Sequence, residues 1–332
     1  MNNFGRIFRV NIFGESHGNG VGILIDGVPA GLPLVFEDFK EDIGRRRSGA
    51  KGTTPRVEAD LPHLHTGIFN DHTTGAPLTI LFENTNTRSK DYSKLKTVPR
   101  PGHADFVAEQ KYGGYQDYRG GGHFSARLTT GIVAAGVVAK KLIAPIKIEA
   151  QLIEAGGNTN IEEAINAAME TSDSIGGIIE CRVSNMPVGL GEPYFDSLEG
   201  VLSHMMFSIP AIKGIEFGAG FEAARMTGSQ HNDEIVNTDG TTRTNHAGGI
   251  NGGISNGNDL VFRLAVKPTS SISLKQETIN LETGKMEELE VQGRHDLCVA
   301  LRAPVIVEAA TAIVLADFMM LENRLQKVVE SK

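Results

Sequence analysis

Cysteine is scarce in this sequence. The 332 residues include two cysteines, Cys181 and Cys298, and no Cys-x-x-Cys pair. A disulfide framework and a cysteine-based zinc site are therefore both unsupported. The sequence also lacks a His-Glu-x-x-His pair and an aspartate-rich calcium loop, so no motif in it requires a metal.

The sequence also shows no apolar segment typical of a transmembrane helix or of a secretory signal peptide. The first ten residues alternate polar and apolar side chains like a strand and contain no apolar run of a secretory leader. Residues 131–139 are too few to span a bilayer, and residues 304–320 carry Glu308 and Asp317, which favours a buried helix. We expect a cytoplasmic protein that does not enter a membrane.

The chain as a whole has fewer basic than acidic side chains, but its first part does not. Lys and Arg number 32 against 40 Asp and Glu, and the net charge of −8 argues against a general nucleic-acid binder. Residues 1–130 hold 16 basic and 14 acidic side chains (net +2), whereas the remainder holds 16 and 26 (net −10). Six of the ten histidines also lie in the first part. Cationic side chains are thus concentrated where the glycine-rich loops begin, as an anion site in an acidic protein requires.

Glycine is abundant instead, with 39 residues, about 12% against about 7% in typical proteins. Glycine costs backbone entropy on folding, so such an excess indicates many turns or loops that approach a ligand closely. A β-rich fold with tight turns is the other explanation, and we expect both.

The hydrophobic pattern predicts alternating strands and helices. Strands are predicted at residues 4–13, 21–26, 78–82, 146–153, 178–183 and 260–266. Helices are predicted at residues 36–47, 104–111, 126–143, 161–170 and 304–328, of which 126–143 and 304–328 are long and apolar.

A faint internal repeat accompanies these elements. Residues 28–33 (Val-Pro-Ala-Gly-Leu-Pro) resemble residues 186–191 (Met-Pro-Val-Gly-Leu-Gly), and residues 74–82 resemble residues 256–264. Each set is followed by a Gly/Arg/His segment and a long apolar helix. This predicts a single domain over 1–332 with pseudo-equivalent halves at about 1–143 and 144–332, although chance similarity between turns would give the same pattern.

Residues 14–18, Gly-Glu-Ser-His-Gly, match the letters of a serine-hydrolase nucleophile elbow. That elbow requires a strand, a sharp turn and a helix, whereas residues 20–26 continue as a second strand. The pattern therefore disfavours a serine hydrolase. A plain hairpin turn needs no histidine, so His17 is better interpreted as a positioned acid or anion ligand.

Residues 44–52, Gly-Arg-Arg-Arg-Ser-Gly-Ala-Lys-Gly, are not a P-loop, because Ala50 stands where the P-loop lysine is required. Basic residues favour helix C-termini, so a solvated helix end is one interpretation. Three consecutive arginines followed by Lys51 and Arg56 are equally typical of a flexible clamp for a polyanion.

Residues 100–105, Arg-Pro-Gly-His-Ala-Asp, place His103 just before a predicted helix. The helix dipole would lower the pKa of His103, and a bound phosphate nearby would oppose that shift. A capping or surface histidine is the alternative.

Residues 119–127, Arg-Gly-Gly-Gly-His-Phe-Ser-Ala-Arg, are the strongest local signal. Three glycines let backbone N–H groups approach a ligand, and a helix N-terminus follows with its positive dipole. Arg119, His123 and Arg127 add charge, which indicates a phosphate-bearing ligand.

The second half contributes polar segments of its own. Residues 245–257 are glycine-rich, and residues 267–271 (Lys-Pro-Thr-Ser-Ser) end a predicted strand with a cation and three hydroxyls. In residues 293–296, Asp296 follows Arg294 and His295 and could act as a base or relay, with a structural ion pair as the alternative.

In this order the motifs closely resemble those of the chorismate synthases. The segments that carry the resemblance are residues 14–18, 44–49, 100–105, 117–122, 245–249, 267–271 and 293–296. Several independent motifs occur in family order from the N-terminus through the last helix, so the resemblance covers nearly the whole chain.

The resemblance implies an α+β fold, a β-α-β sandwich with helices between antiparallel sheets, in a homotetramer. It implies 1,4-anti-elimination of phosphate and a proton from 5-enolpyruvylshikimate-3-phosphate to give chorismate. Reduced FMN is required in this family although the reaction has no net redox change, and NADPH is a possible reductant of the flavin.

Matching positions imply the site residues. The catalytic residues would be His17, His103 and Asp296, and the substrate would contact Ser16, Arg46, Arg100 and Arg127. Flavin contacts would be His123, Phe124, Ser125, Pro210, Ala211, Gly252, Lys267, Pro268, Thr269, Ser270, Ser271 and Arg294. NADPH would contact Arg46 and Lys51. In this scheme His103 protonates the reduced flavin, His17 serves the departing phosphate, and Asp296 relays the abstracted proton.

Two departures from the family pattern affect these assignments. Many members have Arg-Ser-Ser after the triple glycine, whereas this chain has His123, Phe124 and Ser125, which removes one cation and one hydroxyl. The loop around Lys51 is also shorter. Two rival functions stay open from sequence: a flavin reductase that mainly oxidises NADPH, and a non-catalytic binding protein for anionic metabolites.

Overall fold

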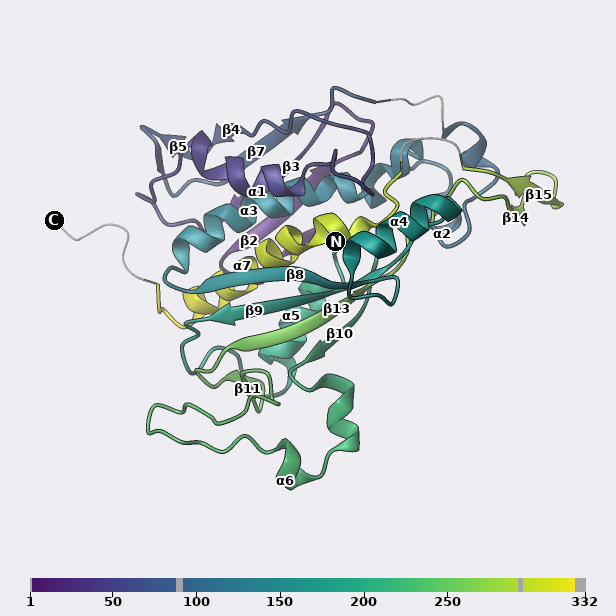
Figure 1. The fold of residues 1–332 in the computed structure, drawn as a ribbon. Coiled ribbons are helices and arrows are strands. Elements are labelled where there is room, and N and C mark those ends of the chain that lie inside the picture. The colour runs from purple at the N-terminus through teal and green to yellow at the C-terminus, as the bar shows by residue number, and fades with distance from the viewer. Residues whose placement is uncertain (1, 88–91, 292–294, 326–332) are drawn as a thin grey trace.

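The computed structural model describes residues 2–87, 92–291 and 295–325. Two antiparallel sheets enclose a layer of helices (Figure 1). The first sheet has the order β1-β2-β3-β7-β4. Its strands are β1 (Asn3–Phe4), β2 (Arg9–Gly14), β3 (Gly20–Asp26), β7 (Leu78–Glu83) and β4 (His63–Thr66). In β7, Leu78, Ile80 and Phe82 are fully buried and alternate with less buried neighbours, so one face of this sheet packs against the helices.

The second sheet has the order β10-β13-β9-β8. Its strands are β10 (Ile212–Phe217), β13 (Leu260–Val266), β9 (Gly177–Ser184) and β8 (Lys147–Ala155). Leu260, Phe262 and Leu264 of β13 are buried at alternate positions, again on one face.

Two long apolar helices, α3 (Thr129–Leu142) and α7 (Ala303–Leu321), pack against each other between the sheets (Figure 1). Gly136 allows their close approach, because a Cβ there would lie 2.3 Å from the Cβ of Ala309. The shorter helices α1 (Lys40–Arg46) and α5 (Leu198–Met206) both pack against α7. The α+β sandwich expected from the resemblance is confirmed.

The two halves have the same topology. After the short β1, the strand order of the first sheet is β2-β3-β7-β4. Taken from its β8 edge, the second sheet has the corresponding order β8-β9-β13-β10. In each half a short helix, α1 or α5, follows the second strand of its set, and a long helix, α3 or α7, comes last. The similar turns at residues 28–33 and 186–191 therefore occupy equivalent places. One continuous core contains residues from both halves, which supports our proposal that the chain is a single domain.

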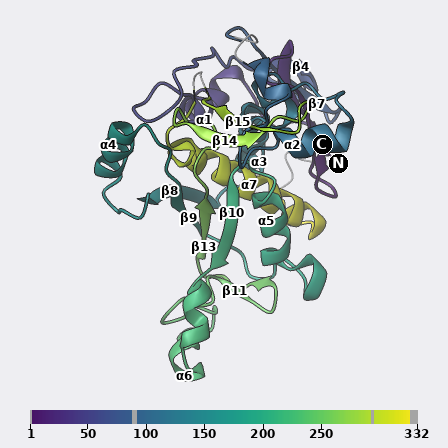
Figure 2. The ribbon, with the colours of Figure 1, turned by 90° about the vertical axis from the view of Figure 1, so that its right-hand side faces the viewer.

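The remaining elements lie around this sandwich. They are β5 (Ile68–Phe69), β6 (His72–Thr73), α2 (Asp105–Tyr112), α4 (Ile161–Thr171), α6 (Gly228–His231), β11 (Ile250–Asn251), β12 (Ile254–Ser255), β14 (Gln276–Ile279) and β15 (Met286–Leu289). Figure 2 shows α6 on an arm that extends from the second sheet, away from the long helices.

Two predicted elements have different bounds from those expected. Residues 4–13 are not one strand, because Gly5, with φ +94°, lies in a reversal that pairs β1 with β2. The last helix ends at Leu321 rather than 328, and Asn323 is left-handed with φ +52°. By length and composition Val299–Leu321 could cross a membrane, but 78% of its apolar window is buried inside the protein, as expected for a core helix.

Asp317 of α7 anchors the N-terminal segment. Its buried carboxylate accepts the backbone N–H groups of Arg6, Ile7 and Phe8 at 3.0, 2.7 and 3.0 Å. We expect Asp317→Ala to lower the free energy of unfolding by about 3 kcal/mol, because buried donors lose their acceptor. Chemical denaturation measures this. Asp196→Ala is the control: it removes only a partly exposed ion pair with Arg6, and should cost under about 1 kcal/mol. Equal losses for the two variants would contradict the anchoring role.

Candidate active site

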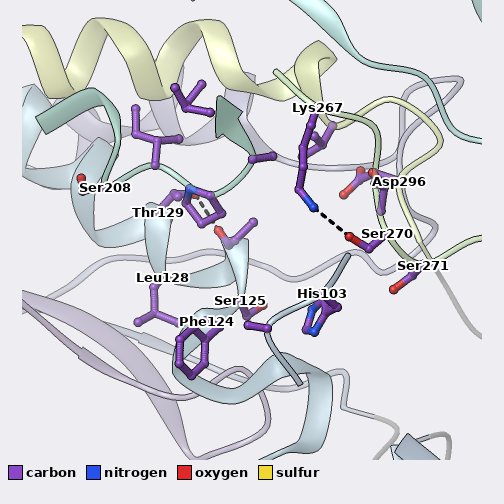
Figure 3. A pocket seen from close by; sticks show the side chains of 18 of the residues that line it. His103, Phe124, Ser125, Leu128, Thr129, Ser208, Lys267, Ser270, Ser271 and Asp296 are labelled. Atoms are coloured by element: carbon purple, nitrogen blue, oxygen red, sulfur yellow. Dashed lines mark hydrogen bonds between the residues drawn. The ribbon is translucent and has the colours of Figure 1, made fainter. Parts of the chain in front are cut away.

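A cavity of about 780 Å³, here called the larger cavity, lies beside the first turn of α3 (Figure 3). Its volume is in the range of small-molecule and cofactor sites. Leu128, Ile132, Ile209 and Val299 supply apolar walls. The predicted site residues that line it are His103, His123, Phe124, Ser125, Thr269, Ser270, Ser271, Pro210, Ala211, Lys267, Pro268 and Asp296. Most of the predicted flavin contacts are therefore brought together.

One predicted flavin contact is not among the lining residues, and another cannot be located. Gly252 lies in the turn between β11 and β12, outside the lining of the larger cavity, so its position in this chain does not support the assignment. Arg294 lies outside the described residues.

Lys267 joins the two halves of the chain at this cavity. Its Nζ donates to the carbonyl oxygen of Gly102 at 2.6 Å and to Oγ of Ser270 at 3.0 Å (Figure 3). Burial, helped by the nearby Lys213, lowers the pKa of Lys267. Both lysines line the cavity, so its rim is positively charged.

A second, smaller cavity of about 160 Å³ adjoins the first. Gly120, Ser125, Ala126, Thr269 and Asp296 line both. Five arginines line the smaller cavity, namely Arg46, Arg56, Arg100, Arg127 and Arg302, against the three carboxylates of Glu58, Asp60 and Asp296. The excess of positive charge suits this cavity to an anionic ligand.

Arg46 is the most deeply buried of these cations. Its Nε donates to Oγ1 of Thr129 at 3.1 Å, and a guanidinium nitrogen lies 3.5 Å from the carboxylate of Asp60. Burial, with Arg302 and Arg127 nearby, lowers the pKa of Arg46 to about 9. Arg46 is still charged at neutral pH, and a bound anion would stabilise that charge.

Arg127 and Ser16 are also in the smaller cavity, as predicted. Arg127 donates to Oδ1 of Asn84 at 3.0 Å and pairs with Asp60. Ser16 is buried, and its backbone N–H donates to the carbonyl oxygen of Gly122 at 3.1 Å.

The three consecutive arginines do not form one clamp. Arg45 pairs with Glu308 on the far side of α1, and hydrogen bonds to Glu308 raise the pKa of Arg45. Arg47 is exposed and donates to the carbonyl oxygen of Ala59. Successive residues of a helix point in different directions, so only Arg46 reaches the cavity and the clamp interpretation is wrong. Lys51 is exposed and lines neither cavity, so it does not share a site with Arg46.

Sequence reasoning missed two of the five arginines as site residues. Arg56 donates to Oγ of Ser16 at 3.0 Å and to Glu58 at 2.7 Å. Arg302 pairs with Asp296 at 2.6 Å, and the sequence named no partner for the ion pair that it left open at Asp296. The run of basic residues after Arg47 was a signal for Arg56, whereas Arg302 belongs to no motif.

The triple glycine lies between the two predicted catalytic histidines. Gly120, Gly121 and Gly122 have φ values of +58°, +78° and +51°, which glycine adopts without strain. A Cβ at Gly120 would lie 2.0 Å from Nδ1 of His17, whereas one at Gly121 would lie 3.5 Å from Cε1 of His103. Close packing of His17 explains Gly120, and the carbonyl oxygen of Asp117, 1.9 Å from the position of a Cβ at Gly122, explains Gly122. Gly121 is explained by its backbone conformation, because a Cβ there would make only an ordinary contact with His103. Arg119 of this motif pairs with Asp117 and lines neither cavity.

His17 is buried, and its ring makes an edge contact with Tyr92 at 5.1 Å between centroids. It follows Ser16 in a strand-turn-strand hairpin between β2 and β3, which excludes the hydrolase elbow as expected. His17 thus lies behind Gly120, next to the smaller cavity.

His103 lines the larger cavity and contacts Asp105 and Arg100. Burial is the main cause that lowers the pKa of His103; Arg100 and Lys267 add to it, and Asp105 opposes it. The direction agrees with the sequence prediction, but burial rather than the helix dipole is the principal cause.

Asp296 faces both cavities. Its Oδ1 accepts the backbone N–H of Thr54 at 2.9 Å and its Oδ2 accepts from Arg302 at 2.6 Å. This carboxylate is therefore fixed at the boundary where two ligands would meet.

Comparison with known proteins decides the family. The chorismate synthase family model matches residues 8–320. The chain belongs to the chorismate synthase family. Family membership places it among the carbon–oxygen lyases.

Individual relatives agree. Chorismate synthase of Chitinophaga pinensis is 62% identical over 332 residues, which are 100% of each chain. Chorismate synthase of Dehalococcoides mccartyi is 46% identical, with 99% of each chain covered. A crystal structure of chorismate synthase superposes with a TM-score of 0.72 at 28% identity, covering 96% of this chain and 93% of that one.

Proposed function

We propose that the protein converts 5-enolpyruvylshikimate-3-phosphate to chorismate by 1,4-anti-elimination. The C–O bond to phosphate and a ring C–H bond break, and the electron pair of the C–H bond forms the new double bond, so there is no net oxidation. The observation that carries the proposal is the arginine-lined smaller cavity, which shares Ser125 and Asp296 with the larger cavity that His103 lines. Five arginines there suit a substrate with one phosphate and two carboxylates.

The smaller cavity is below the usual volume of a ligand pocket, about 300 Å³. Its five arginines are already paired with carboxylates, four of them with Glu58, Asp60 or Asp296 and Arg100 with Asp105. Substrate binding on this proposal exchanges part of these ion pairs for contacts with the ligand, so the site opens as it fills.

The larger cavity fits reduced FMN in size and in chemistry. Apolar walls suit an aromatic ring system, and Lys267, Lys213 and Ser270 provide cations and a hydroxyl for a phosphate. His123 stands where many members have arginine. Its Nδ1 donates to the carbonyl oxygen of Gly14 at 2.9 Å and its Nε2 lies 3.2 Å from Oδ1 of Asn2, so it fixes the N-terminal strands as well as lining the cavity. When bound, reduced FMN supplies electron density that promotes departure of the phosphate.

The histidines and Asp296 handle protons in this proposal. His17, beside Ser16 and Gly120, donates a proton to the departing phosphate. His103 holds a proton at the wall of the larger cavity. Asp296, at the boundary of the cavities, relays the proton from the substrate. NADPH remains a possible reductant, but the separation of Arg46 from Lys51 gives no support for a shared NADPH site.

We also propose a cytoplasmic homotetramer. Large apolar side chains are exposed on and near the arm, among them Phe195 (97%), Tyr194 (87%), Phe221 (77%) and Ile235 (73%). Such side chains are typical of surfaces that other subunits cover. Light scattering tests this, and a monomer in solution would contradict it.

The reaction is tested directly with chemically reduced FMN and 5-enolpyruvylshikimate-3-phosphate in the absence of oxygen. We expect phosphate and chorismate in equal amounts while the flavin stays reduced. NADPH oxidation without phosphate release would instead support a flavin reductase. Binding of the phosphorylated enol ether with neither activity would support a binding protein.

A further inference from the structure

One buried carboxylate joins the two cavities. Asp105, the first residue of α2, lies between His103 of the larger cavity and Arg100 of the smaller one. Its Oδ1 is 2.6 Å from Nδ1 of His103 and 2.8 Å from a terminal nitrogen of Arg100. Its Oδ2 is 2.7 Å from Nε of Arg100 and accepts the backbone N–H of Arg100 at 3.1 Å. Arg100 also donates to Oγ of Ser271 at 2.9 Å.

These distances determine which ring nitrogen of His103 carries hydrogen. A carboxylate oxygen and a bare imidazole nitrogen both offer lone pairs and would repel each other at 2.6 Å, so Nδ1 must donate to Asp105. The terminal nitrogen of Arg100, 3.1 Å from Nδ1, could donate to a bare Nδ1 in the other tautomer, but that tautomer would leave the shorter 2.6 Å contact with Asp105 repulsive. Nε2 is left as the nitrogen that gains or loses a proton. It lies on the ring edge that faces Gly121, 3.6 Å from the position of a Cβ there.

We propose that Asp105 is a positioning residue that keeps hydrogen on Nδ1 of His103, so that proton exchange occurs at Nε2, while the same carboxylate holds Arg100 for the substrate. This inference rests on the proposed function and specifies how one side chain orients a group in each cavity. A carboxylate that hydrogen-bonds to a histidine fixes its tautomer and ring orientation in the same way in other sites.

The charge of Asp105 also affects the titration of His103. Other charged groups surround the ring: Arg100, Lys267, Lys213 and Asp296 toward the cavities, and Lys96, Glu109 and Asp117 on the opposite side. Arg100 and Lys267 lower the pKa of His103, and the carboxylate of Asp105 opposes that effect. Without this negative charge the pKa of His103 falls further, so the ring loses its proton at lower pH. Burial raises the pKa of Asp105, but hydrogen bonds from Arg100 and His103 and their positive charge outweigh burial and hold that pKa well below its usual range, so Asp105 is ionised at neutral pH.

The test is the tautomer of His103 in the full chain without flavin or substrate. Imidazole nitrogen resonances of histidine-labelled protein distinguish Nδ1–H from Nε2–H, and His103→Gln assigns the signal. We expect neutral His103 of the unaltered protein to carry hydrogen on Nδ1. Hydrogen on Nε2 would overturn the proposal, and the tautomer itself is measured on the unaltered protein.

Asp105→Asn tests the function of the carboxylate. We expect mixed tautomers, a His103 titration moved to lower pH, and kcat/KM reduced about tenfold or more. Turnover that needs protonated His103 should also begin to fall at lower pH than in the unaltered protein. Glu109→Gln, one turn further along α2, is the matched control, because it removes the same charge from a side chain that accepts from Gln116 and makes no hydrogen bond or ion pair with His103. It should leave the tautomer unchanged and move the His103 titration much less than Asp105→Asn does. An unchanged His103 signal in Asp105→Asn would overturn the positioning role even if the protein is a lyase. If the protein lacks lyase activity, the tautomer measurement still decides this inference separately.

Discussion

His103→Ala is expected to reduce turnover about a hundredfold or more. The side chain lines the larger cavity, and we propose that it acts there as an acid–base group. Loss of such a group typically reduces the rate about a hundredfold or more. Anaerobic assays with reduced FMN measure the rate of phosphate release. Flavin binding, followed by absorbance, should persist because the apolar walls and Lys267 are unaltered.

His204→Ala is the matched control for this variant. His204 lies on α5, makes an edge contact with Phe4 at 5.5 Å between ring centroids and lines neither cavity. Its removal should leave turnover within about twofold, as expected for surface changes away from a site. If His103→Ala also retained full turnover, the acid–base role would be lost, whereas loss of flavin binding alone would make His103 a ligand contact.

Gly120→Ala should be nearly as damaging as His17→Ala, for which we also expect a loss of about a hundredfold. The new methyl group would lie 2.0 Å from Nδ1 and 2.2 Å from Cε1 of His17, so the ring or the loop must move. A displacement of about 1 Å in a catalytic group can cost about a hundredfold in rate. Steady-state kinetics with saturating flavin measures kcat.

Gly121→Ala separates this clash from backbone strain. Both glycines have positive φ, so an alanine at either position pays a similar cost of about 1–2 kcal/mol in stability. The methyl group at position 121 meets His103 only at an ordinary contact distance of 3.5 Å. We expect Gly121→Ala to lose less than tenfold in kcat. Equal losses in the two variants would show that loop strain, rather than the position of His17, limits the rate.

The sequence predicted those parts of the fold that depend on local pattern. The alternation of apolar residues at 260–266 gave the bounds of β13, and the two similar turns indicated the repeat that both sheets display. Reversal at Gly5 was missed because the apolar alternation continues through it, while the pairing of β1 with β2 is decided by the backbone.

The site was predictable where residues belong to one motif and unpredictable where distant segments meet. His103, Lys267 and Ser125 were found from their own segments. Arg45, Arg46 and Arg47 point in different directions because each meets a different acceptor: Glu308 from a remote part of the chain for Arg45, Asp60 for Arg46 and the carbonyl oxygen of Ala59 for Arg47. The partner of Asp296 is likewise set by where α7 begins relative to residue 296, which local sequence does not encode.

The packing of α3 on α7 has a consequence for the origin and engineering of this chain. Twelve of the 14 residues of α3 and 15 of the 19 residues of α7 are buried. A polypeptide of either half alone would expose one apolar helix along its length and would hold only part of each cavity. Such a half could remain in solution only by pairing with another half, whether the complementary fragment or a copy of itself. The topology is thus that of a dimer joined into one chain, and separately expressed halves should recover a site only when they are folded together.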